Sequence, residues 1–421
     1  MKRFLKLFAM LLLVLGIFLF AGCSNQVKPI SFKQTETFQT LNEVKYPKSS
    51  VSPKEISTET VTALKNFTIN TALELFKQEN KNYIYSPLSL YIALSMLLEG
   101  VSKEEAKLEL ENLLGLERET NRLSMKTVYE NNYYKNNKGI LRLANSIWFK
   151  NNYPVEKDFL DILAKDYYAE SYQTDFDSEG HQNIIDWINY YTEDFLELTK
   201  DKFPVSASTV ILLLNTIYFD NKWKESFDKK ATREGEFYAS SGNVTAEFMI
   251  HNITSKYKEY DNYQVAEDYF ENNASITYIL PKAEIDVSDL LNAEVIANAL
   301  NPADKSTLKL DIVVPKFKYF SKFILNDNLK NLGVQEVFDS SSNSLDLMSK
   351  GRGLFVSLVQ QNAGIELSES GVKAAAVTGI AVEESASIEQ QFILNRPFIY
   401  IIKDAYGIPL FMGLLQNPKT E

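Results

Sequence analysis

Apolar residues recur at helical spacing in the first part of the chain and at strand spacing in the later part. Across 61–75 and 183–198 they return every three or four residues, which predicts two amphipathic helices. Ser86 followed by Pro87 is typical of a helix start, and Gly100 is typical of a helix end. The first part of the chain is therefore predicted to be mainly helical.

Alternating or continuous apolar stretches predict the strands. The run 209–219 is almost entirely apolar, as expected of a central strand that is covered on both faces. Helical patterns come first, strands dominate later, and no repeat or low-complexity linker divides 61–418, so we predict a single α+β domain over residues 61–421. The predicted strands lie at 140–150, 209–219, 232–250, 275–281, 309–319, 354–365 and, as a final pair, within 392–412.

The run 369–385 near the C-terminus fits neither pattern. Read at a period of two, one of its faces carries no charge, while the other is small in the middle and charged at both ends. Its consecutive alanines favour a helix, so local preference does not fix a single state. The run is either a core strand of weak propensity or a segment that is exposed in one state and inserted into a sheet in another. The uncharged face consists of Val372, Ala374, Ala376, Thr378, Ile380 and Val382.

Six motifs together resemble one protein family. Glu369-x-Gly371, followed by small residues to Thr378, resembles the hinge of the reactive-centre loop of the serpins. Other motifs similar to those of serpins follow the family's order from about Val61 to Pro418, and six ordered motifs are far more specific than one short pattern. The other five motifs are 82–89, 213–223, 314–317, 396–398 and 410–413.

The resemblance implies a fold and a mechanism. The fold is a single α+β domain with a large central mixed β-sheet, two further sheets, about eight or nine helices, and an exposed reactive-centre loop over roughly 369–391. A serine protease, or a papain-like cysteine protease, would cleave this loop, become trapped as an acyl-enzyme and move with the loop as it inserts into the central sheet. The fourteen residues 372–385 would span about 46 Å at ~3.3 Å each, enough to carry a protease from pole to pole of such a body.

Four positions resemble the serpin shutter, the region where the central sheet opens: Ser86, Ser89, Asn215 and Gln361. Asn215 interrupts the apolar run 209–219, and a buried amide without partners is destabilising. Serpins usually have His where Gln361 stands, and Gln does not titrate, so we expect any pH sensitivity of that histidine to be missing. For Ser86 and Ser89, a helix cap and a place on a helix surface are the alternatives.

Glu369 and Lys316 are placed like the ion pair of the serpin breach, at the top of the opening sheet, and Trp223 would pack beside them. A plain core position is the alternative for Trp223. The hinge implied by the resemblance comprises Glu369, Gly371, Val372, Ala374, Ala375, Ala376 and Thr378.

The hinge departs from the family's pattern at Val372, where Thr or Ser is usual, and at Val377, where Ala or Gly is usual. Both valines are uncharged and β-branched, which suits a strand, yet a bulkier residue could slow insertion and make the inhibitor a substrate. Two functions follow: a suicide inhibitor of proteases, or a serpin-fold binding protein that never inserts its loop. The uncharged inserting face favours the inhibitor.

Counting from the hinge glycine places the scissile bond between Ser385 and Ala386, and counting back from Arg396 shifts it by one residue. Glu384 is the third candidate and would suit a Glu-specific protease. No Lys or Arg lies between Glu383 and Gln391, so trypsin-like targets are disfavoured. Small side chains suit the shallow pockets of elastase-like or subtilisin-like proteases.

The sequence offers no active site of its own. Its two histidines, His181 and His251, are far apart and have no cysteine near them, so His/Cys metal sites and a Ser-His-Asp triad are disfavoured. We expect both histidines on the surface. No phosphate-binding glycine motif occurs either, so we predict no enzyme activity, no metal and no cofactor.

Charge and cysteine content narrow the partners. The chain of 421 residues has a formal net charge of −11 and a pI near 5.0, which argues against nucleic acid and against heparin-type polyanions. Its single cysteine excludes an internal disulfide. We expect a monomer.

Residues 1–22 resemble a signal peptide, with a basic start, a hydrophobic run and a small-residue end. The run 19–23, which ends in the only cysteine, resembles a bacterial lipobox, so we predict a lipid-modified Cys23 and a protein anchored at the cell surface. An ordinary secretory signal or a membrane-spanning anchor is the alternative. Residues 23–60 would form a flexible tether, or would dock on the body through scattered apolar residues such as Phe38.

Overall fold

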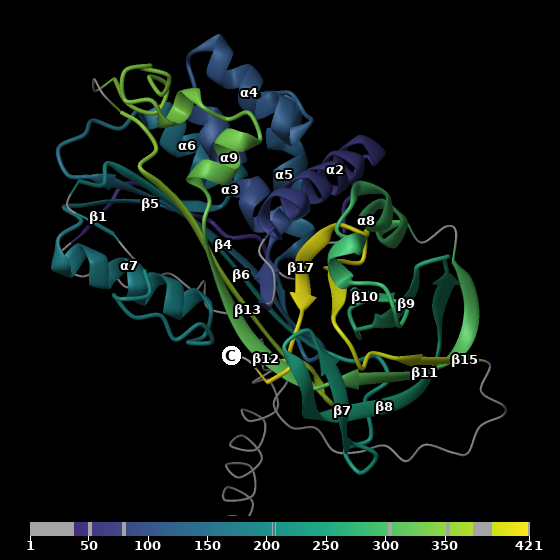
Figure 1. The fold of residues 1–421 in the computed structure, drawn as a ribbon. Helices are drawn as coiled ribbons and strands as arrows, with labels where there is room; N and C mark the ends of the chain where they lie inside the picture. Colours follow the sequence, from purple (N-terminus) through teal and green to yellow (C-terminus); the bar gives the residue numbers. More distant parts are fainter. Residues whose placement is uncertain are drawn as a thin grey trace, which may run out of the picture. The chain divides into compact units, whose positions relative to one another are not determined.

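The computed structural model describes residues 38–48, 53–77, 81–203, 205–206, 208–301, 305–350, 354–373 and 390–419. These residues form eight α-helices, two short 3-10 helices and seventeen strands (Figure 1). The helix count matches the expectation. The α-helices are α2 (Thr58–Leu75), α3 (Pro87–Gly100), α4 (Glu104–Leu114), α5 (Arg118–Asn132), α6 (Lys157–Asp166), α7 (Ser178–Tyr191), α8 (Ala293–Leu300) and α9 (Asn326–Asn331), and the 3-10 helices are η1 (Val287–Leu290) and η2 (Glu336–Phe338).

The first of the two sheets in the described residues is mixed, has eight strands and is called sheet A below. Its strands lie in the order β1-β5-β4-β6-β14-β13-β12, and β3 pairs with β4. Strands β4 and β6 are antiparallel, whereas β4 and β5 are parallel. The bounds are β1 (Gln39–Thr40), β3 (Tyr134–Lys135), β4 (Gly139–Lys150), β5 (Ala169–Thr174), β6 (Ile211–Lys222), β12 (Phe317–Ile324), β13 (Leu358–Ser368) and β14 (Gly371–Val372).

The second sheet, sheet B, has nine strands in the order β15-β11-β8-β9-β10-β16-β17-β2, with β7 paired to β8. The two separate further sheets that we expected are joined here, because the long β8 pairs with β11 along most of its length and with β9 at its end. The bounds are β2 (Tyr83–Tyr85), β7 (Arg233–Ala239), β8 (Gly242–Glu259), β9 (Tyr263–Tyr269), β10 (Ser275–Pro281), β11 (Ser306–Pro315), β15 (Gln390–Ile393), β16 (Phe398–Lys403) and β17 (Pro409–Leu415).

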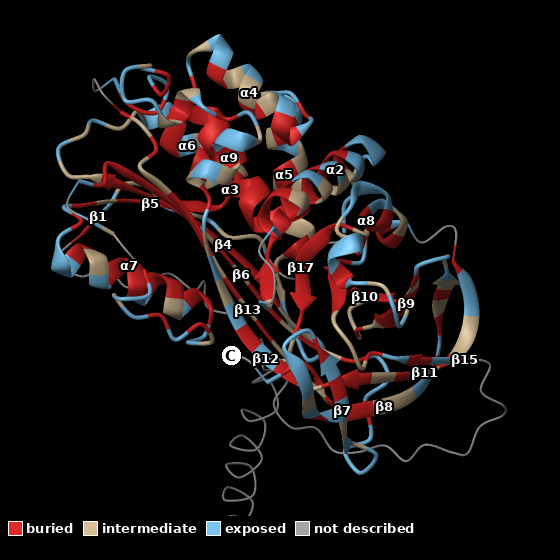
Figure 2. Cartoon of the chain, in the orientation of Figure 1, coloured by how far each residue is buried: buried red, intermediate tan, exposed pale blue. Residues whose placement is uncertain are grey.

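Helix α3 lies at the centre of the core. All its residues are buried, and it contacts both β6 of sheet A and β17 of sheet B (Figure 2). On β6, Ile211, Leu213 and Phe219 belong to this core, whereas Leu212 and Leu214 are buried outside it. Since side chains alternate along a strand, sheet A has a core face towards α3 and an opposite face that α7 covers.

Strands β6 and β13 touch at only one end of sheet A. They pair directly and in parallel at Leu212–Leu358 and Leu213–Val359. At the other end β14 lies between them, opposite Asn221 and Lys222 of β6 and Leu367 and Ser368 of β13. Between these two contacts, residues 214–220 of β6 and 360–366 of β13 have no strand between them in the described part of the chain. The two unpaired stretches are equal in length.

Residues 38–48, called the N-terminal strap below, lie against the body. Strand β1 pairs with β5 at the edge of sheet A, and Phe38 is buried against the rings of Trp148 and Tyr172. Asn42 accepts a hydrogen bond from the Ser171 amide at 2.9 Å and donates one to the Ala169 carbonyl at 3.0 Å. The tether expected over 23–60 is therefore not separate from the body where the structure describes it, and α2 begins at Thr58.

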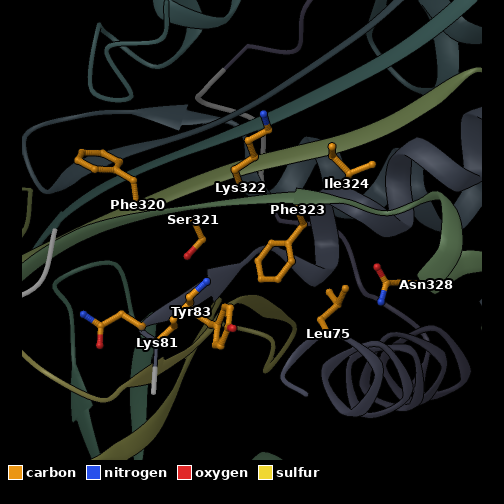
Figure 3. Close-up of a pocket in the computed structure, with 10 residues that line it drawn as sticks. Leu75, Lys81, Tyr83, Phe320, Ser321, Lys322, Phe323, Ile324 and Asn328 are labelled. Atoms are coloured by element: carbon orange, nitrogen blue, oxygen red, sulfur yellow. The ribbon is translucent and has the colours of Figure 1, made fainter. Parts of the chain in front are cut away.

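The opposite edge of sheet A, β12, borders a cavity of about 330 Å³. In Figure 3 the Phe323 and Tyr83 rings lie towards each other, with centroids 5.8 Å apart, and Lys322 lies on the other side of the strand. The exposed Lys318 and Lys322 place charges along this edge. Edge charges of this kind disfavour pairing with another chain.

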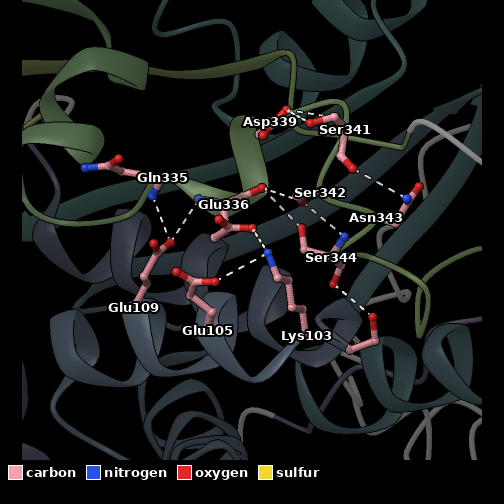
Figure 4. A network of polar contacts seen from close by, with 11 residues as sticks. Lys103, Glu105, Glu109, Gln335, Glu336, Asp339, Ser341, Ser342, Asn343 and Ser344 are labelled. Carbon is pink, nitrogen blue, oxygen red and sulfur yellow. Dashed lines mark hydrogen bonds and ion pairs between the residues drawn. The ribbon is translucent and has the colours of Figure 1, made fainter.

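A polar network joins α4 to the segment that precedes β13 (Figure 4). The Lys103 ammonium contacts the Glu336 carboxylate at 2.5 Å, and Glu109 accepts hydrogen bonds from the amides of Gln335 and Glu336. The network ties η2 and residues 339–344 to the N-terminal half of α4.

Candidate functional site

The hinge begins inside sheet A, as β14. A Cβ on Gly371 would lie 2.0 Å from the Asn221 carbonyl oxygen, and its φ is 143°, so only glycine fits this place. Val372 is buried with its side chain in the core, opposite Asn221 and Leu367. Val372 thus lies on the core face of sheet A, and its role in insertion stays a prediction.

Lys373 ends the strand. Its φ is 45°, a left-handed conformation that is unfavourable for lysine, and its amide donates to the Glu366 carbonyl at 2.8 Å. The Lys373 ammonium lies 4.4 Å from the Phe195 ring centroid and 4.5 Å from that of Tyr218. Burial lowers the pKa of Lys373, although the carboxylate of Asp220 opposes this.

Glu369 contacts both Thr232 and Lys316. Glu369 Oε1 accepts a hydrogen bond from the Thr232 hydroxyl at 2.9 Å and lies 3.4 Å from Lys316 Nζ. Burial alone would raise the pKa of Glu369, but its backbone hydrogen bond, Thr232 and Lys316 together lower that pKa. Glu369 is therefore held ionised, and the ion pair fixes the start of the hinge on β11–β12.

Trp223 is buried and contacts the residues that lead into the hinge. Its indole Nε1 donates to the Ser368 carbonyl at 2.8 Å, and its backbone amide donates to the Ser370 carbonyl at 3.3 Å. Its ring stacks on Phe270 with centroids 4.6 Å apart, and Phe227 packs edge-on. Trp223 thus joins the end of β6 to the turn between β13 and β14.

The four shutter residues come together at the first turn of α3. Gln361 of β13 accepts a hydrogen bond from the Ser86 amide at 2.8 Å and donates to the Ser86 carbonyl at 2.9 Å. On the other side, the Ser89 hydroxyl donates to Asn215 of β6. One turn of helix therefore holds both strands that border the open stretch. Ser86 also caps α3, as the alternative proposed, whereas Ser89 is buried and not on a helix surface.

The polar chain continues beyond the predicted residues. Asn215 donates to Asn145 of β4, and Asn145 donates to the Tyr167 carbonyl at 2.7 Å. Asn145 is fully buried, and it satisfies the amide of Asn215 in the interior. Its only signal in the sequence is an amide between the apolar residues of the predicted strand 140–150, which Arg142 and Ser146 of the same strand make less distinctive. Thr232 gave no such signal, because it precedes a strand of mixed polarity.

Several predicted residues lie outside the described part of the chain. These are the hinge residues Ala374, Ala375, Ala376 and Thr378, the scissile-bond residues Ser385 and Ala386, and the lipidation residue Cys23. Their roles stay predictions.

The expectation that both histidines lie on the surface is wrong for His251. Its side chain is 7% exposed, its Nε2 lies 2.9 Å from Asp268 Oδ2, and its ring stacks on Phe227 with centroids 3.7 Å apart. His181 is half-buried, and its Nε2 contacts the Phe203 carbonyl. Neither histidine forms part of a metal-binding group among the described residues. No helix in these residues is long and apolar enough to cross a membrane.

Residues 62–418 match the family model "Serpin (serine protease inhibitor)". The chain belongs to the serpin family. It is 30% identical to mouse neuroserpin, with 81% of this chain and 87% of that protein covered. The native-state structure of tengpin, a thermophilic serpin, is similar with a TM-score of 0.80 and 26% identity, and covers 90% of this chain and all of tengpin.

Human thyroxine-binding globulin in complex with its ligand shares the serpin fold, with a TM-score of 0.77 at 19% identity over 86% of this chain and 100% of that one. Serpins are generally protease inhibitors and not enzymes, although some members are non-inhibitory. The predicted family and the α+β serpin fold are thus confirmed.

Proposed function

We propose that this serpin is a suicide inhibitor of serine proteases that inserts its cleaved loop between β6 and β13. The observation that carries the proposal is the unpaired stretch between these strands, with β14 already occupying its upper end. A narrow opening lies directly beyond β14, lined by residues of both strands that include Ile217 and Ile365. Backbone donors and acceptors in this stretch would be satisfied by a new strand.

The registers of β14 specify how such a strand would continue. Val372 pairs with Asn221 and Leu367, so each later loop residue would face the next earlier residue on β6 and on β13. In this register Thr378 arrives between Asn215 and Gln361. The Thr378 hydroxyl would then lie beside the side-chain amides of Asn215 and Gln361 and could form hydrogen bonds with them, so that no polar group is buried without a partner.

The register also assigns the two faces of the inserted strand. Val372 lies on the core face, so Ala374, Ala376, Thr378 and Ile380 would follow it there. None of these residues carries a charge, and burying them would require no unpaired ion. The departure from the family at Val372 does not prevent insertion, because Val372 is already inserted.

The alternative is a non-inhibitory binding protein, since thyroxine-binding globulin has the same fold. In such a protein the loop need not enter the sheet. The partly inserted hinge and the uncharged inserting face favour the inhibitor. Elastase-like or subtilisin-like proteases are the proposed targets, with cleavage after Ser385, because small residues surround that bond; papain-like cysteine proteases are a second target class.

We also infer that Cys23 is lipid-modified and holds the protein at the surface of a bacterial cell, since a signal-like run precedes this single cysteine. Fatty-acid labelling of wild type and of Cys23→Ala tests this inference. The label should be lost in the variant, and equal labelling would refute the anchor.

The test of inhibition is a complex with elastase or subtilisin that resists SDS. Wild type should form it, and mass spectrometry of the released peptide should place its first residue at Ala386. Val372→Arg should be cleaved without forming the complex, because a charge would enter the core face of the sheet. Val372→Thr, which restores the family's usual residue at nearly the same volume, should keep inhibiting. Cleavage of wild type without a complex, or without a gain in melting temperature, would support the binding-protein alternative.

A further inference from the structure

A second cavity has a volume of about 330 Å³. Its wall comes from the C-terminal end of α5, β3, the turn between β9 and β10, the turn between β16 and β17, and residues Lys48 and Pro53. Its volume lies within the range of about 300–1,000 Å³ that is usual for small-molecule sites. It belongs neither to the breach nor to the shutter.

Amide side chains dominate this cavity. Five of its lining residues are asparagines, and Tyr133, Tyr134 and Tyr406 add phenol rings. Some of these groups are fixed in place: Asn132 donates to Asp404 at 2.8 Å, and Asn272 donates to Asn221. Others are uncommitted: the Asn273 backbone amide donates to the Phe270 carbonyl at 3.0 Å, but among the described residues no hydrogen bond engages the exposed Asn273 side chain or the Oδ1 of Asn272. An asparagine amide offers a donor and an acceptor at once.

The two carboxylates that line the cavity, Glu130 and Asp404, already have ion-pair or hydrogen-bond partners. Glu130 forms an ion pair with Lys54, which also fixes residue 54 beside α5. Asp404 is buried, and its oxygens accept hydrogen bonds from the amides of Tyr406 and Ile408 and from Asn132. A strongly charged ligand would find no matching ion here except the exposed Lys48. Hydroxyl groups, which both donate and accept, match the uncommitted amides.

We propose that this cavity binds a neutral carbohydrate of one or two sugar rings, with hydroxyls on Asn272 and Asn273 and ring carbons on the tyrosines. The site touches the hinge through one residue. Asn221, which pairs with Val372, accepts hydrogen bonds from Asn272 and from the Tyr134 hydroxyl at 3.1 Å. A bound sugar would brace these two side chains, so it would also stabilise the native form in proportion to its occupancy.

The test titrates the full-length protein with cellobiose, maltose and N,N′-diacetylchitobiose, by calorimetry and by melting temperature. At least one sugar should bind saturably and raise the melting temperature. Asn273 has a φ of 62°, so Asn273→Gly removes the amide without backbone strain, and it should weaken binding about tenfold for one lost hydrogen bond. Asn152→Gly is the matched control, because Asn152 is also exposed with a φ of 70° but lies beyond the other end of β4.

Three results would overturn the proposal. The first is that none of the three sugars binds saturably. The second is that Asn273→Gly and Asn152→Gly bind the sugar equally well. The third is that a sulfated heparin oligosaccharide binds with the same dependence on Asn273, which would show a site for polyanions. The sugar-binding assays need no protease. A negative result in them would therefore refute the sugar site and leave the inhibitor proposal unaffected.

Discussion

Replacing Phe38 by alanine should lower the free energy of unfolding by roughly 3 kcal/mol, at the lower end of the range for Phe→Ala in cores. Phe38 is 5% exposed, and its ring lies 5.7 Å from that of Trp148 and 5.2 Å from that of Tyr172. The lower end applies because the strap lies at the edge of sheet A, where its neighbours can close part of the cavity. The strap contributes to stability only if it remains docked in solution.

Denaturant unfolding followed by tryptophan fluorescence measures this loss, since Trp148 lies in contact with Phe38. Asn42→Ala should lower the free energy of unfolding by only about 1 kcal/mol, because the backbone groups that lose their hydrogen bonds lie at the sheet edge and can reach water. Leu123→Ala is the control: Leu123 is 60% exposed on α5, so its loss should stay within about 0.5 kcal/mol. A Phe38→Ala variant that unfolds like Leu123→Ala would show that the strap does not hold the body.

Two further predictions concern the opening sheet. Gln361→Leu leaves the buried Ser86 amide without its partner, while the Ser86 carbonyl keeps its hydrogen bond from the Leu90 amide, so the substitution should destabilise the native form by roughly 1–3 kcal/mol in denaturant unfolding. Gln335→Leu, at an exposed side chain, should change little. Burial raises the pKa of Asp220 to about 6, although the hydrogen bond from Tyr218 and the charge of Lys373 act to lower that pKa. Between about pH 4 and 6 Asp220 is therefore protonated more often in the native form than in the unfolded chain. The contribution of Asp220 to stability should therefore fall as the pH rises through this window, so the slope of stability against pH should be more positive in Asp220→Asn than in wild type; an unchanged slope would contradict the assignment.

The sequence predicted the family and the fold class, and it singled out candidate site residues, because these residues carry chemical signals that do not depend on distant contacts. Asn215 stood out as an amide in an apolar run, and Gly371 as a glycine before a run of small residues. The structure brings Asn215 to Ser89 and gives Gly371 a place that a Cβ would fill. Such residues can be recognised from the strand alone.

Other features depend on contacts between distant parts of the chain, so local patterns could not reveal them. The strap needs the edge of β5, which lies far along the sequence, and its few apolar residues look the same in a spacer. The burial of His251 depends on Asp268 and Phe227 from two other segments. The joining of the two smaller sheets depends on a short pairing at the end of β8.

We expect the first turn of α3 to govern how long the native protein survives. Ser86 is held by β13 through Gln361, and Ser89 is held by β6 through Asn215, so the strands cannot separate while both sets of hydrogen bonds persist. If β6 and β13 separate before the loop is cleaved, one of these two sets of hydrogen bonds must break before an inserted strand can replace it. The lost hydrogen bonds therefore raise the activation barrier for strand separation and do not change the energy of the final state. The half-life of the active form is then a rate set by a few buried hydrogen bonds. Substitutions at this turn would shorten the working life of each molecule even where the fold at equilibrium looked unchanged.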